Sequence, residues 1–151
     1  MRDTVDFDLP SGNLWYKFNL GATNPTETAT WPHEWWGDYY AWGETEPKDD
    51  YNMYNYKHSK IINAPRPNVP YDELFTKYCH NPKDGYKGYS DNLTQLAPED
   101  DAVHAKLGLN YFIPTESDFI ELFNNTVQTL KKDYKGIKGL NGVELTGKED
   151  D

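Results

Sequence analysis

The sequence contains a single cysteine, Cys79, in 151 residues. One cysteine excludes an internal disulfide and any zinc site that is built from several cysteines. The four histidines are scattered and have none of the spacings typical of a zinc site. We expect Cys79 to be a buried, unreactive thiol, because its neighbour His80 is adjacent in sequence only and is no evidence of a catalytic pair.

Long hydrophobic runs and basic residues are also scarce. No apolar run approaches the ~18–20 residues that a membrane-spanning helix needs. No secretory signal follows Met1, which leaves two alternatives: a protein that is not secreted, or one whose signal is not part of this sequence. Lys and Arg number 15 against 25 Asp and Glu, so the net charge is −10. Such a charge repels phosphate backbones and argues against nucleic-acid binding.

Aliphatic side chains are few, and Leu, Ile, Val and Phe together make up less than a fifth of the chain. With the acidic charge, this composition approaches that of a disordered protein. The chain nevertheless has 5 Trp and 12 Tyr. Each large ring can bury roughly 150–250 Å². We therefore expect a folded domain with a modest aromatic core and long polar loops.

The hydrophobic pattern predicts strands near both ends of the chain. Residues 5–9 and 14–20 are expected to form a hairpin around the turn at 10–13, since Leu14, Tyr16, Phe18 and Leu20 alternate with polar residues. Two further strands are expected near 127–134 and 142–146. Residues 45–95 show little periodicity and are rich in proline, which indicates a long loop insertion.

Two short helices are predicted in the second half. The first covers 98–107 and ends at Gly108. The second begins after Thr115, which is expected to cap it together with Asp118. Its buried face is predicted to consist of Phe119, Ile120, Leu122, Phe123 and Val127. The combination of short helices and antiparallel strands predicts an α+β fold.

No catalytic motif is present. Carboxylates at 99–101 and 44–50 are suited to Ca²⁺, which prefers oxygen ligands. A helix start accounts fully for the first group, and a solvated loop is the better interpretation of the second. The chain lacks a phosphate-binding glycine loop, a nucleophile elbow and a dinucleotide fingerprint. We therefore predict no catalytic residue, no metal site and no cofactor; calcium is conceivable and has no specific support.

Tryptophans cluster between residues 31 and 42. Trp36 and Trp42 are expected to contribute to the core. Exposed aromatics on loops are frequent binding hot spots. The candidate ligand-binding residues are therefore the aromatic side chains of the central loops: Trp31, Trp35, Tyr51, Tyr54 and Tyr56.

A series of motifs resembles one known family. Residues 37–48 read GDYYAWGETEPK, residues 9–12 read LPSG, and residues 19–22 read NLGA. Further matches follow in order at 76–78 (TKY), 91–94 (DNLT), 98–102 (PEDDA) and 113–115 (IPT). Together they resemble the "major paralogous domain" family of gut Bacteroidetes and Fibrobacter, over roughly residues 5–147. The resemblance implies that residues 1–151 form a single C-type-lectin-like domain, in which two short helices pack on a small antiparallel sheet with long irregular loops.

The chain departs from this family in several places. Phe112 and Ile113 stand where the family motif has other residues, and the family's Trp and Arg there are absent. The family pattern also continues beyond Lys148 with segments that complete the sheet. Either the chain is a shortened relative, or it is part of a longer one. Residues 46–48 differ by one residue from the Glu-Pro-Asn sugar motif of calcium-dependent lectins, and the partner motif is missing.

The resemblance leaves three functions open. The first is a non-enzymatic binding or adhesion module of a gut Bacteroidetes surface or secreted protein, with a protein or glycan ligand and an extracellular or cell-surface location. The second is a structural or receptor-binding component of a Bacteroidetes phage virion, in which a homo-oligomer or a larger assembly completes the sheet. The third is a formylglycine-generating enzyme, which is remote because the catalytic cysteine pair is absent.

Overall fold

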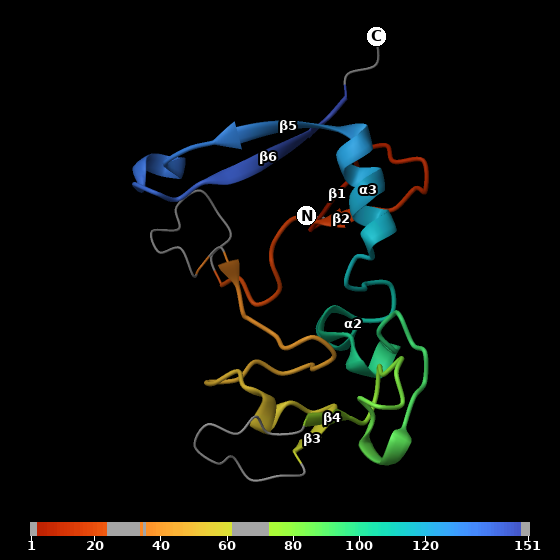
Figure 1. Ribbon diagram of the computed structural model, residues 1–151. Helices are drawn as coiled ribbons and strands as arrows, with labels where there is room; N and C mark the ends of the chain where they lie inside the picture. Colours follow the sequence, from red (N-terminus) through yellow and green to blue (C-terminus); the bar gives the residue numbers. More distant parts are fainter. Residues whose placement is uncertain (1–2, 24–33, 35, 62–72, 149–151) are drawn as a thin grey trace. The chain divides into compact units, whose positions relative to one another are not determined.

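The computed structural model describes residues 3–23, 34, 36–61 and 73–148. The chain divides into two compact units. Unit 1 consists of Met1–Gly37 and Pro114–Asp151, and unit 2 is the segment between them, Asp38–Ile113. Figure 1 shows short helices and strands joined by long loops. The fold is a small α+β structure with two-stranded antiparallel sheets.

The predicted N-terminal hairpin is confirmed in a shorter form. Strand β1 (Thr4–Val5) pairs antiparallel with β2 (Trp15–Tyr16). The strands end early because Asp8 has a left-handed φ of 53°, which is incompatible with a continuing strand. Leu9 follows this bend and is buried.

Helix α3 (Glu116–Asn125) begins as predicted. The Thr115 side chain accepts from the Asp118 backbone N–H at 3.3 Å, and the Asp118 carboxylate accepts from the Thr115 N–H at 2.8 Å. This reciprocal pair is a capping box with Asp in place of Glu. Ser11 holds the helix to the first hairpin, because its hydroxyl donates to Glu121 at 2.6 Å.

The predicted buried face of this helix is wrong in most positions. Only Leu122 is buried, whereas Phe119, Ile120 and Phe123 are exposed. Trp15 contacts Phe119 at a ring-centroid distance of 5.3 Å but covers it incompletely. The helical period was identified correctly, but nothing else in the described part of the chain packs over the remaining rings.

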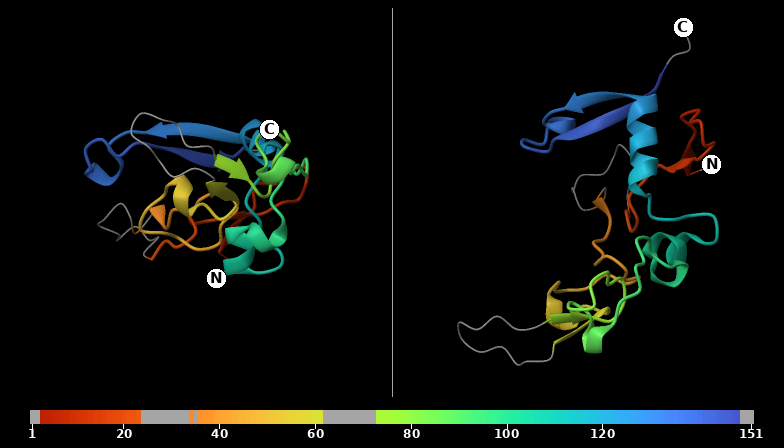
Figure 2. Two further views of the ribbon diagram at one scale, coloured as in Figure 1. Left: turned by 60° about the horizontal axis from the view of Figure 1, so that its bottom comes forward. Right: turned by 45° about the vertical axis from the view of Figure 1, so that its right-hand side comes forward.

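A second hairpin follows α3 directly. Strand β5 (Thr126–Lys131) pairs in antiparallel register with β6 (Gly142–Gly147), and Leu130 lies opposite Val143. Both strands confirm the sequence-based expectation, although Val127 belongs to the sheet rather than to the helix face. A short 3-10 turn, η4 (Tyr134–Gly136), lies between the strands (Figure 2). Leu130 and Val143 are exposed.

Unit 2 has little regular structure. Its strands β3 (Ser59–Ile61) and β4 (Glu73–Phe75) form a short antiparallel pair. Its remaining elements are the 3-10 turns η1 (Met53–Asn55), η2 (Tyr86–Gly88) and η3 (Pro98–Asp100), and the helix α2 (Ala102–Leu107). The single helix predicted for 98–107 is therefore two pieces. Asp101 separates them with extended backbone and caps α2 through the His104 N–H.

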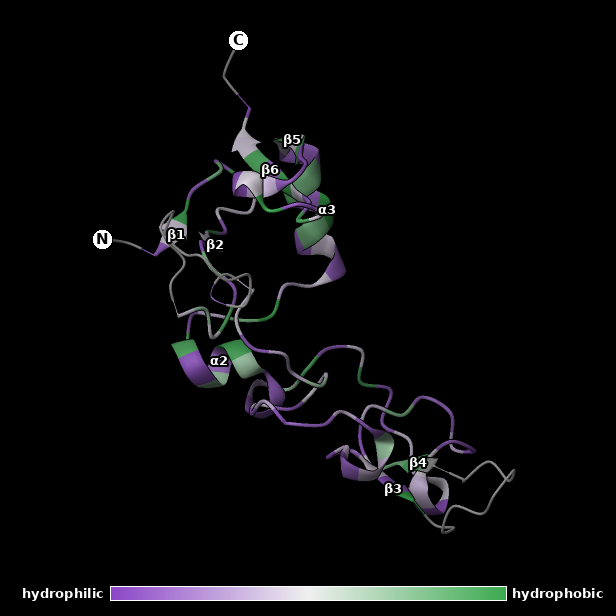
Figure 3. Cartoon of the chain, turned by 90° about the vertical axis from the view of Figure 1, so that its left-hand side faces the viewer, coloured by the Kyte–Doolittle hydropathy of each residue, from purple (hydrophilic) through white to green (hydrophobic). Residues whose placement is uncertain are grey.

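Hydrophobic residues are sparse along the ribbon of unit 2, as the colouring of Figure 3 shows. In the part of unit 2 that the structure describes, the buried apolar side chains are Cys79 and Ala102. The expectation of a buried Cys79 is confirmed, and its thiol lies 3.1 Å from the Asn81 carbonyl oxygen. Across the described helices, none is long and apolar enough to span a bilayer.

Candidate functional site

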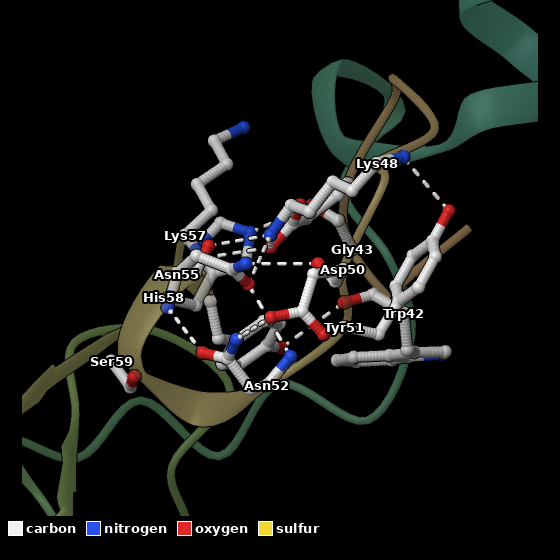
Figure 4. Close-up of polar contacts among 12 residues, drawn as sticks. Trp42, Gly43, Lys48, Asp50, Tyr51, Asn52, Asn55, Lys57, His58 and Ser59 are labelled. Carbon is white, nitrogen blue, oxygen red and sulfur yellow. Dashed lines mark hydrogen bonds and ion pairs between the residues drawn. The ribbon is translucent and has the colours of Figure 1, made fainter.

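The first polar centre of unit 2 is the carboxylate of Glu44, which is only 6% exposed. Glu44 Oε1 accepts from Lys48 Nζ at 2.7 Å and from the Lys57 backbone N–H at 2.8 Å. The Lys48 ammonium also donates to the Asn55 carbonyl oxygen at 2.5 Å. Asn55 belongs to turn η1, so these contacts tie that turn to the 42–48 loop (Figure 4). We call this group of four residues, Glu44, Lys48, Asn55 and Lys57, the Glu44 cluster.

The second centre is Asp100, which is 2% exposed. Its Oδ1 lies 2.6 Å from Lys57 Nζ, and its Oδ2 accepts from Lys77 Nζ at 2.6 Å and from the Tyr78 hydroxyl at 2.8 Å. A buried carboxylate is stable only when opposite charges and donors compensate the loss of water. Lys57, Lys77 and Tyr78 provide that compensation, and with Asp100 they form what we call the Asp100 cluster.

Lys57 and His58 connect the two clusters. Lys57 binds Glu44 through its backbone and Asp100 through its side chain. The His58 Nε2 atom lies 2.8 Å from the Gly43 carbonyl oxygen. Because a carbonyl oxygen can only accept, this nitrogen carries a proton. Gly43 is needed here: its φ is +79°, and a Cβ atom would lie 3.0 Å from the His58 ring.

These contacts shift the acid–base properties of the Asp100 cluster. Burial disfavours the charged form of Asp100, but hydrogen bonds from Lys57, Lys77 and Tyr78 outweigh it and hold the pKa of this carboxyl well below its ordinary value. The hydrogen bond to Asp100 raises the pKa of Lys77. At neutral pH Asp100 is therefore ionised and Lys77 is protonated.

Two further carboxylates organise the backbone. Asp91 accepts from the N–H groups of Tyr78 at 2.7 Å and Cys79 at 3.0 Å, and Asp101 accepts from the Ile113 N–H at 2.8 Å. Each of these bonds joins segments more than ten positions apart. Acidic side chains thus hold the loops of unit 2 where another protein would use a hydrophobic core.

The loops fixed in this way display aromatic rings to solvent. Tyr39 is 67% exposed, Tyr54 53% and Trp42 49%. Tyr51 is also exposed, and its hydroxyl donates to the Tyr39 carbonyl oxygen and accepts from the Lys48 N–H. In Figure 4 the rings of Trp42 and Tyr51 project to one side of the polar network, away from Asn55 and Ser59. We call Tyr39, Trp42, Tyr51 and Tyr54 the aromatic face.

The predicted ligand-binding residues are only partly brought together. Tyr51 and Tyr54 lie in the same turn region and are exposed, as expected. Tyr56 is half-buried, and its hydroxyl donates to the Trp42 carbonyl oxygen at 3.1 Å, which suits a supporting role. Trp31 and Trp35 lie outside the described residues.

Sequence reasoning assigned other aromatics to the wrong class. Trp36 and Trp42 were expected in the core, but both are exposed. Trp42 packs one edge against Tyr78, with centroids 4.6 Å apart, and leaves about half its surface open. The sequence did carry a signal that Trp42 is exposed. Gly, Asp and Glu residues surround it, and a segment so polar rarely enters a core.

The acidic stretches considered for calcium have other roles. Asp100 neutralises two lysines, Asp101 caps α2, and Glu46 lies 2.6 Å from Lys106 Nζ. Within the described ranges, no three His, Cys, Asp or Glu side chains gather where they could hold a metal ion.

Comparisons with protein-family models, with curated proteins and with solved structures found no match to this chain.

Proposed function

We propose that this chain is a non-enzymatic binding or adhesion module of a gut Bacteroidetes surface or secreted protein, built on a C-type-lectin-like fold. The observation that carries the proposal is the aromatic face held on a loop frame that hydrogen bonds fix in advance. Rigid loops bind with a smaller loss of conformational entropy than flexible ones. Exposed Trp and Tyr side chains supply most of the binding energy in many interfaces.

The family motifs at 9–12 and 37–48 support the location and the fold in this proposal. The longest motif covers Tyr39 and Trp42, which are two of the exposed rings. The residues proposed to contact ligand are Tyr39, Trp42, Tyr51 and Tyr54, with Trp31 and Trp35 as further candidates from the sequence.

The proposal is tested by applying the labelled protein to an array of glycans and extracellular proteins. The double variant Tyr39→Ala/Tyr54→Ala is expected to lose most of the signal on whichever spots the wild type binds. Phe112→Ala is the matched control, because it removes an exposed ring that stacks on His104 outside the aromatic face. Signals that survive the double variant, or that vanish equally in the control, would contradict the proposal.

A second candidate, a structural or receptor-binding component of a Bacteroidetes phage virion, is favoured by the β5–β6 hairpin. Within the described residues no further strand pairs with either outer edge, and Leu130 and Val143 are exposed. Open edges invite pairing with a neighbouring chain. The oligomeric state measured by light scattering tests this second candidate. A virion component is expected to form a stable symmetric oligomer, whereas a monomer at all concentrations argues against this role.

A further inference from the structure

We propose that the aromatic face is a docking site for a polypeptide segment rich in arginine, which deepens the proposed function by naming its partner class and rests on it. The binding surface would combine the rings of Tyr39, Trp42, Tyr51 and Tyr54 with the neighbouring carboxylates of Asp38, Asp49 and Asp50. The occupant is a cationic peptide or an exposed loop of a basic protein.

The first argument is the local charge. Lys48 is the only basic residue between positions 38 and 56, a stretch that contains five acidic residues: Asp38, Glu44, Glu46, Asp49 and Asp50.

The lone base is not available to a ligand. The Lys48 ammonium is turned inward to Glu44 and Asn55, and Lys106 neutralises Glu46. In the described part of the chain, no ion pair reaches Asp38, Asp49 or Asp50. All three are exposed. The loop that carries the rings therefore presents uncompensated negative charge to solvent.

The second argument is the chemistry of the rings. The face of Trp or Tyr attracts a cation, and arginine is the most frequent partner because its planar guanidinium also stacks. Tyr39 and Tyr54 are more than half exposed, so both offer ring surface to an incoming side chain. Carboxylates beside the rings add charge-assisted hydrogen bonds to the same guanidinium.

The third argument is steering. The whole chain carries a net charge of −10, which attracts basic partners and repels acidic glycans, phosphates and acidic proteins. Neutral sugars also stack on aromatic rings, and their hydroxyls can donate hydrogen bonds to carboxylates, but they gain no charge attraction from the three exposed acids. The observations thus favour a cationic peptide over a neutral glycan.

The test uses four probes in titration calorimetry with the full chain. They are a decapeptide alternating Arg and Gly, the same peptide with citrulline for Arg, the same peptide with Glu for Arg, and a neutral maltohexaose. Citrulline keeps the planar shape and removes the charge. The Arg peptide is expected to bind, more weakly as salt rises, and the other three are not.

Variants locate the site. Tyr39→Ala is expected to weaken binding of the Arg peptide by about 2- to 30-fold, the range that a cation–π contact provides. Asp49→Asn is expected to weaken it and to reduce its salt dependence. Phe112→Ala and Asp84→Asn are the matched controls for ring and charge, and both are expected to bind as the wild type does. Tyr54→Ala replaces Tyr39→Ala if the latter fails to fold.

Three results of these experiments would overturn the inference. Equal binding of the citrulline and Arg peptides removes the role of charge, and no binding of the Arg peptide removes the partner class. Binding of maltohexaose that depends on Tyr39 assigns the face to neutral glycans, which leaves the proposed function standing. The proposed function itself is tested separately by the array, and it fails when the double variant retains the wild-type signals or when the Phe112→Ala control loses them equally.

Discussion

Lys57 Nζ lies 2.6 Å from Asp100 Oδ1, across 43 positions of the sequence. Lys57 also donates its backbone N–H to Glu44, so one residue links two of the buried carboxylates of unit 2. Removing Asp100 therefore takes the counter-charge from the Lys57 ammonium. Removing Glu44 takes the counter-charge from Lys48 and the acceptor from the Lys57 backbone N–H.

Asp100→Asn is expected to lower the free energy of unfolding of unit 2 by about 1.5–3 kcal/mol, the range for hydrogen bonds to a charged group, because Lys57 and Lys77 keep access to solvent. Urea unfolding followed by tryptophan fluorescence measures it. Asp84→Asn, at an exposed site, is the control and is expected to change stability by less than about 0.5 kcal/mol. Equal unfolding midpoints for the two variants would show that the Asp100 cluster is not stabilising.

Acidification is expected to destabilise unit 2. The pKa of Asp100 in the folded chain lies below the unfolded value of about 3.9. At a pH between these two pKa values, the unfolded chain therefore binds more protons than the folded one. The stabilisation by Asp100 is complete when the pH is above the pKa of the unfolded state, and it is lost as the pH falls through the pKa of the folded state. Wild-type stability should thus decline below about pH 5, and Asp100→Asn should decline less steeply. Parallel pH profiles would contradict this assignment.

Gly43→Ala is expected to destabilise the chain by about 1–3 kcal/mol through its left-handed backbone, with an added cost from the His58 ring. Gly88→Ala is a close control, because Gly88 has the same φ of +79° and nothing within 4 Å of its Cβ position. The difference between the two variants in thermal unfolding reports the crowding at His58. A larger effect at Gly88 would overturn the packing argument.

Thr115→Ala is expected to cost about 1 kcal/mol, because α3 loses the side chain that accepts from the Asp118 N–H. Thr115→Ser keeps the hydroxyl and should retain most of the stability. Circular dichroism during thermal unfolding compares them. Equal losses in both variants would show that the methyl group, not the cap, is what matters.

Tyr51→Phe is expected to cost about 0.5–1.5 kcal/mol and to loosen the aromatic face, since the hydroxyl joins the Tyr39 carbonyl to the Lys48 N–H. Ligand binding should weaken although the ring remains. Tyr86→Phe is the control, because no hydrogen bond to the Tyr86 hydroxyl is present among the described residues. An unchanged affinity in Tyr51→Phe would show that the loop is held by other contacts.

Local signals in the sequence predicted local structure. Thr115 and Asp118 lie three positions apart and identified the start of α3, and the alternation near residues 14–20 identified the first hairpin. Each signal is decided by neighbours within one turn, so a single sequence suffices. The exposure of Tyr51 and Tyr54 was likewise expected from their place in the central loops.

Contacts between residues far apart in the sequence could not be predicted from the sequence. Asp100 is one acid among 25, and nothing local selects Lys57 and Lys77 as its partners. The amphipathic period of α3 was visible, but whether another element covers Phe119 and Phe123 depends on tertiary packing. The same limitation placed Trp42 in the core, when it packs only one edge on Tyr78.

The scarcity of buried apolar side chains has a consequence for temperature. Among the described residues, the buried apolar side chains are those of Leu9, Cys79, Ala102 and Leu122. Unfolding raises the heat capacity through apolar exposure and lowers it through polar exposure. The increment per residue should therefore fall below the usual ~12–15 cal/mol/K, and the stability curve should be broad and shallow. Such a protein would keep the loops of unit 2 in place over a wide range of temperature.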